Sequence, residues 1–149
     1  MFTHILVAVD GSDYSRRALR TATELAAKFG SDVFVIHVDE CDRGRTAAYA
    51  LESPVEAARL VADAVKTIRG SGIEATGEVC DVATGHVAEA IVEAANDKHI
   101  NLIVMGSHGL SSVRALLPGS VTHRVTQMAD VAVLVDCWVG RTALAAAKQ

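Results

Sequence analysis

The chain has 149 residues, enough for one domain with a hydrophobic core, and half of them are apolar. Its formal net charge of −4, with no long run of like charge, argues against a nucleic-acid-binding protein. No apolar run reaches the roughly 18 residues that cross a bilayer, and residues 1–4 do not resemble the start of a signal peptide. We therefore expect no membrane partner. Because the three cysteines are widely spaced and form no CxxC, we expect reduced thiols in a cytoplasmic protein.

Five short segments of the chain are predicted to be strands. Four of them, residues 5–9, 33–38, 102–105 and 131–135, are continuous apolar runs rich in β-branched side chains. Such runs are typical of parallel strands that are covered on both faces. The remaining segment, residues 73–80, alternates apolar and polar side chains, which indicates a half-exposed strand at a sheet edge.

Apolar stripes at helical spacing predict a helix after each of the first four strands. The first helix begins near Ser12 or Asp13, which are good N-cap residues, and ends at Gly30. The second begins with a capping box formed by Ser53 and Glu56. Strict alternation of strand and helix predicts an α/β fold: a single-domain three-layer αβα structure with a five-stranded parallel sheet.

The order of the strands follows if the first strand is central and the polar third strand lies at an edge. The chain then winds outward and crosses back, which gives the order 3-2-1-4-5. Ligands of such sheets bind outside the carboxyl ends of the strands, where the winding direction reverses. The sequence therefore places a candidate site at Asp10 and Gly11 and at the segment that begins with Gly106.

A glycine pattern follows the fourth predicted strand. It reads GxxG, nine residues and then GS, and it contains Gly106, Gly109, Gly119 and Ser120. Glycines let the backbone approach a ligand closely, and the first N–H groups of the last helix favour a phosphate. We expect Ser120 and Thr122 to add hydroxyl donors. The alternative is that these glycines only turn the chain.

These residues give the chain a resemblance to the universal stress protein family, in its ATP-binding branch. The resemblance extends over nearly the whole chain and rests on residues 5–12 (ILVAVDGS), on Val38, on residues 105–109 (MGSHG) and on residues 119–122 (GSVT). The chain departs from the family at residues 130–132, where many members carry Cys-Pro before the last strand.

The resemblance implies a role for each matched position. Asp10 is expected to bond the ribose hydroxyls, although it could instead cap the first helix. The other positions are an adenine-lining group (Ala8, Val9 and Val38), a residue beside the nucleoside (Met105) and a phosphate cradle (Gly106, Gly109, Gly119, Ser120 and Val121).

The function that the resemblance predicts is an ATP-binding stress-response regulator or switch, with ATP bound alone or with Mg²⁺. The sequence has no GxxxxGK[S/T] and no tight cluster of zinc ligands. It offers no general base and no positioned cation, so we expect slow hydrolysis or none. His108 could contact a phosphate or lie on the loop surface, and His123 and Arg124 lie on the last helix. Two alternatives stay open: a slow ATPase of the same fold, and a dimeric interaction protein that binds no nucleotide.

The last strand also suggests a partner. Residues 131–135 are apolar without interruption from Val131 at one end to Val135 at the other, with no lysine or proline to protect a sheet edge. The resemblance likewise implies a homodimer paired through this strand. The alternative is that the C-terminal tail, residues 137–149, covers the edge of the domain formed by residues 1–136.

Overall fold

The fold is described from a computed structural model, which describes residues 1–41, 53–107 and 120–137. Strands and helices alternate along the chain, as predicted. In order they are β1 (His4–Ala8), α1 (Asp13–Phe29), β2 (Asp32–Cys41), α2 (Pro54–Gly70), β3 (Ala75–Ala83), α3 (Val87–Asp97), β4 (Leu102–Gly106), α4 (Val121–Met128) and β5 (Ala132–Asp136).

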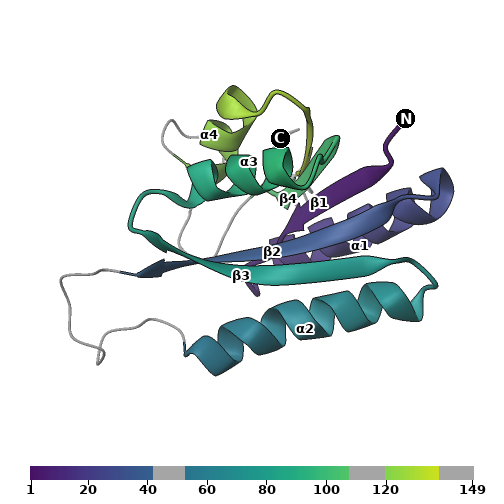
Figure 1. Ribbon diagram of the computed structural model, residues 1–149, viewed down its shortest axis with the longest axis horizontal. Coiled ribbons are helices and arrows are strands. Elements are labelled where there is room, and N and C mark those ends of the chain that lie inside the picture. The colour runs from purple at the N-terminus through teal and green to yellow at the C-terminus, as the bar shows by residue number, and fades with distance from the viewer. Residues whose placement is uncertain (42–52, 108–119, 138–149) are drawn as a thin grey trace, which may run out of the picture.

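The five strands form one sheet in the order β3-β2-β1-β4-β5, and every neighbouring pair is parallel. Helices α1 and α2 cover one face, and α3 and α4 cover the other (Figure 1). The predicted three-layer α/β fold and its strand order are therefore confirmed. β3 lies at one edge of the sheet, as its polar alternation indicated.

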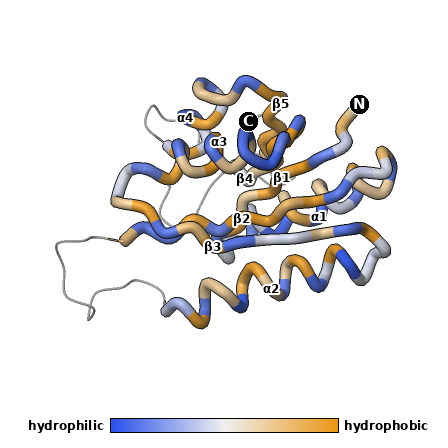
Figure 2. Tube along the Cα trace, viewed as in Figure 1, coloured by the Kyte–Doolittle hydropathy of each residue, from blue (hydrophilic) through white to orange (hydrophobic). Residues whose placement is uncertain are grey.

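Side chains of successive strand residues alternate between two cores. Ile5 and Val7 of β1 lie in the core under α1 and α2, whereas Leu6 lies in the core under α3 and α4. Along α2, hydrophobic and hydrophilic segments alternate, as expected for a helix that buries one side (Figure 2). Both cores are almost entirely aliphatic, which agrees with the low aromatic content of 4%.

The largest differences from the predicted strand boundaries are in β2 and β3, and the other strands differ by one residue at one or both ends. β2 extends to Cys41, three residues beyond the apolar run, and β3 covers Ala75–Ala83 where residues 73–80 were predicted. The two strands pair in register as far as Cys41 and Ala83, beyond the carboxyl end of β1. The apolar run ends earlier because the last β2 side chains, including Asp39 and Glu40, are no longer deeply buried.

The predicted helix caps are present. Ser12 begins α1 by accepting a hydrogen bond from the Ser15 N–H, and Gly30 ends it in the left-handed conformation with φ of 69°. The capping box of α2 is complete, because Ser53 and Glu56 each accept a hydrogen bond from the other's backbone N–H. In the part of the chain that the structure describes, no helix is both long and apolar enough to span a membrane.

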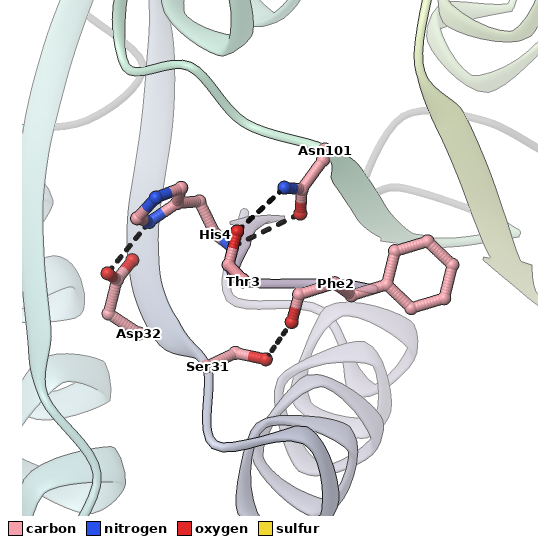
Figure 3. A network of polar contacts seen from close by, with 6 residues as sticks. All are labelled: Phe2, Thr3, His4, Ser31, Asp32 and Asn101. Atoms are coloured by element: carbon pink, nitrogen blue, oxygen red, sulfur yellow. Dashed lines mark hydrogen bonds and ion pairs between the residues drawn. The ribbon is translucent and has the colours of Figure 1, made fainter.

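A polar network joins the amino ends of β1, β2 and β4 (Figure 3). The Asn101 amide accepts from the His4 N–H at 3.1 Å and donates to the Thr3 hydroxyl at 2.9 Å. The His4 ring pairs with Asp32 at 2.8 Å, and the Ser31 hydroxyl donates to the Phe2 carbonyl. This network fixes the sheet at the edge opposite the predicted site.

Candidate functional site

The carboxyl end of β1 leads directly into the first turn of α1. Asp10 is half-buried, and one of its carboxylate oxygens accepts a hydrogen bond from the Ser12 N–H at 2.9 Å. Gly11 lies between them with a φ of 82°, a conformation that favours glycine. Asp10 therefore does make the capping contact that the sequence left open.

The residues before Asp10 are held by β2. The Val9 N–H donates to the Ile36 carbonyl at 2.9 Å, and the Val9 carbonyl accepts from Nδ1 of His37 at 2.7 Å. His37 is buried, and its Nδ1 carries the proton of this bond because a carbonyl only accepts. Ala8 and Val38 are half-buried and pack on the core under α3 and α4. Protein groups thus already bond the Val9 backbone, which the resemblance had assigned to adenine.

The end of β4 lies against the start of α1. Met105 and Gly106 are buried, and a Cβ added to Gly106 would lie 2.8 Å from the backbone carbon of Tyr14. Real Cβ atoms essentially never come so close, so close packing alone requires a glycine at this position. The structure therefore gives Gly106 a packing role, whatever else it contacts.

The start of α4 is tied to the same strand end. Thr122 is buried, and its hydroxyl donates to the Gly106 carbonyl at 3.2 Å. In the single chain the proton of this hydroxyl is therefore used within the protein, and the donation to a phosphate stays a prediction. Ser120 is the N-cap of α4, and its hydroxyl oxygen accepts from the His123 N–H at 3.2 Å.

Several predicted residues are near one another at this edge, and others cannot be placed. Val121 is partly exposed at the first position of α4, next to Ser120. Gly109, Gly119 and His108 lie outside the described residues. The structure thus brings together the ends of β1 and β4 and the N-terminus of α4, at the point where the strand order reverses.

A second cluster of polar side chains lies at the ends of β2 and β3. Asp39, Cys41 and Asp81 each offer one potential metal-ligand atom, and these atoms lie within 4.8 Å of one another. Sequence spacing could not reveal the cluster, because Asp39 and Asp81 meet only through the strand register. The side chains are half to fully exposed, and exposed acidic groups are common without a metal.

The three cysteines are thiols that differ in exposure. Burial, followed by the negative charges of Glu78, Asp81 and Glu93, raises the pKa of the Cys80 thiol. Because the thiolate is the reactive form, Cys80 should react with a disulfide reagent at pH 8 more slowly than the exposed Cys41 and Cys137. Stopped-flow labelling with single-cysteine variants measures this order, and fastest labelling of Cys80 would contradict it.

The fold defines a doubly wound α/β protein whose strand order reverses between its first and fourth strands. The universal stress protein family model matches residues 1–136, and the chain belongs to that family. It is 33% identical to a universal stress protein of Thermus aquaticus, over 91% of this chain and 98% of the relative. It is 30% identical to universal stress protein YxiE of Bacillus subtilis, over 91% and 99% of the two chains.

A solved structure of another universal stress protein has a similar fold. The universal stress protein from Archaeoglobus fulgidus in complex with dAMP is 30% identical, with a TM-score of 0.69, and the match covers 90% of this chain and 97% of that one.

Proposed function

We propose that this protein binds an adenine nucleotide, ATP alone or with Mg²⁺, at the carboxyl ends of β1 and β4. The observation that carries the proposal is the position of Asp10 and of the α4 N-terminus at the reversal of the strand order. The Archaeoglobus fulgidus relative supports the choice of ligand, because that protein was solved with dAMP.

The proposed contacts follow the residue types at this edge. Asp10 would bond the ribose, and the backbone N–H groups at the start of α4 would face the phosphates. The other proposed site residues are Ala8, Val9, Val38 and Met105 at the nucleoside and Gly106, Gly109, Gly119, Ser120 and Val121 at the phosphates. Thr122 is also proposed as a phosphate donor, which requires its hydroxyl to exchange the Gly106 carbonyl for the ligand. We assign this site to a domain of residues 1–136, with residues 137–149 as a tail.

The proposal includes slow hydrolysis or none. Fast phosphoryl transfer needs a positioned water and a cation at the transferred group. Arg124, the arginine of α4, is bonded to Gly85 and Glu89 instead. Nucleotide occupancy would then act as a switch, by favouring one conformation of the protein. A slow ATPase of the same fold is the competing assignment, and a turnover above about 1 s⁻¹ would favour it.

Thermal unfolding with and without nucleotide tests the proposal. ATP at 100 times its Kd should add about 2.7 kcal/mol to the free energy of unfolding. For a chain of this length, that gain corresponds to a rise of about 5–10 °C in Tm. Inorganic triphosphate at the same concentration is the control for a charge effect. An unchanged Tm at millimolar ATP would reject nucleotide binding and leave the non-nucleotide alternative.

We further propose a homodimer in which two β5 strands pair across a twofold axis. β5 is the last strand of the sheet, and its apolar side chains are only partly buried in the single chain. Sedimentation equilibrium should therefore give twice the chain mass of 15.7 kDa at micromolar concentration. A monomer under those conditions would reject the pairing.

A further inference from the structure

Arg124 connects α4 to the first turn of α3 and to the turn that precedes it. One guanidinium nitrogen, Nη1, donates to the Gly85 carbonyl at 2.7 Å, and the other, Nη2, pairs with the Glu89 carboxylate. Gly85 lies in the turn between β3 and α3, and Glu89 lies in the first turn of α3. One side chain thus ties α4 to two points that are 39 and 35 residues away in the sequence.

The connection continues to β2. The Gly85 N–H donates to a carboxylate oxygen of Glu40 at 3.2 Å, and Glu40 follows Val38 by two residues. The bonded series therefore runs from Glu40 through Gly85 to Arg124 and Glu89. It joins the end of β2, where the base would bind, to the helix whose N-terminus would face the phosphates.

The geometry of this series depends on the arginine fork and on the glycine. A guanidinium can bond two acceptors at once in fixed directions, and a lysine ammonium lacks that planar fork. Gly85 has a φ of 86°, which a residue with a Cβ adopts only with strain. The second carboxylate oxygen of Glu89 is buried and has no partner in the described part of the chain. Loss of Arg124 would therefore leave a partly buried negative charge without its cation.

Helix α4 has only eight residues, so a few anchors fix its direction. Val125 is 0% exposed and packs in the core, and Thr122 bonds the Gly106 carbonyl. Both of these anchors hold α4 to β4 or to the core beneath it. Arg124 provides the link toward β2 and β3.

We propose that Arg124 is a positioning residue, which sets the distance between the base end and the phosphate end of the nucleotide site. The inference rests on the proposed function. The bonds from Arg124 to Gly85 and Glu89 hold α4 in place. Arg124 therefore affects the phosphates, which are the part of the ligand that would reach α4. Its loss should weaken the binding of ATP and leave the binding of adenosine nearly unchanged.

Isothermal titration of Arg124→Met with ATP and with adenosine tests this. We expect the Kd of ATP to rise about tenfold, which corresponds to about 1.4 kcal/mol, and the Kd of adenosine to change less than about twofold. Arg124→Lys should not restore ATP affinity, because it keeps the charge but not the fork. The same substitution at the exposed Arg59 of α2 is the control and should change neither Kd.

The outcomes separate the inference from the proposed function. If the wild-type protein binds no ATP, the proposed function fails. If the wild type binds ATP and Arg124→Met binds it equally well, only the inference is wrong. Recovery of ATP affinity in Arg124→Lys would also overturn it, because a charge acting on the phosphates would then explain the effect.

If Arg124→Met does not fold, a second pair of variants tests the positioning role of Arg124. Gly85→Ala disturbs the carbonyl that Arg124 bonds, and Gly72→Ala introduces a similar strain, at a φ of 78°, in the turn after α2. An added Cβ meets nothing within 4 Å at either position. Gly85→Ala alone should weaken ATP binding, and equal Kd values for the two variants would overturn the inference.

Discussion

Replacing Gly106 with alanine is expected to lower the free energy of unfolding by about 1–3 kcal/mol, the usual effect of overpacking a core. The new Cβ would lie 2.8 Å from the backbone carbon of Tyr14 and 2.9 Å from its Cβ and carbonyl oxygen. These atoms belong to the first turn of α1 and cannot rotate away as a long side chain can. Relief of the clash would require β4 or α1 to shift, and β4 is buried along its whole length.

Urea unfolding measures this effect, with Gly70→Ala as the matched control. Gly70 ends α2, and an added Cβ there meets nothing within 4 Å. Alanine is the better helix former by up to about 1 kcal/mol, so the control should be neutral or stabilising. Equal stability of Gly106→Ala and the wild type would show that the contact with Tyr14 is not limiting.

Replacing Asp10 with asparagine is expected to raise the Kd of ATP by about 10- to 100-fold. Hydrogen bonds that involve a charged group contribute about 1.5–3 kcal/mol, and asparagine loses the charge and one of the two acceptor oxygens. The variant still offers an oxygen to the Ser12 N–H, the contact that the carboxylate makes at 2.9 Å. Stability should therefore change little while affinity falls.

The control for this variant is Asp13→Asn, three residues along the chain. Asp13 forms a surface ion pair with Arg16, and its side chain is 90% exposed, so its loss should leave ATP affinity unchanged. Titration calorimetry with ATP compares the two. Wild-type affinity in Asp10→Asn would mean that Asp10 only caps α1.

Sequence patterns predicted the strands and the helix caps because these depend on local signals, whereas the strand order also needed the assumption that the first strand is central. Apolar runs, the polar alternation of β3 and the capping box at Ser53 and Glu56 are each readable within a few residues. The ends of β2 and β3 were not predicted because their last residues pair in the sheet without deep burial. Apolar periodicity does not detect such residues.

The candidate site was only partly predictable for a related reason. A hydroxyl at a helix start can bond a ligand or the protein, and only the fold shows that Thr122 bonds the Gly106 carbonyl. The sequence likewise does not reveal whether Gly106 lacks a side chain to make room for a ligand or for Tyr14. The bond from Arg124 to Gly85 spans 39 residues, so no spacing rule predicts it.

The central claim is that an adenine nucleotide binds where β1 and β4 end and α4 begins. A titration of the ¹⁵N-labelled protein with ATP, followed by nuclear magnetic resonance, tests it most directly. We predict that the largest amide shifts occur at Asp10, Gly106 and Val121. Shifts gathered instead in the hollow of about 500 Å³ between α2 and β3, around Val65 and Gly77, or none at millimolar ATP, would contradict the claim.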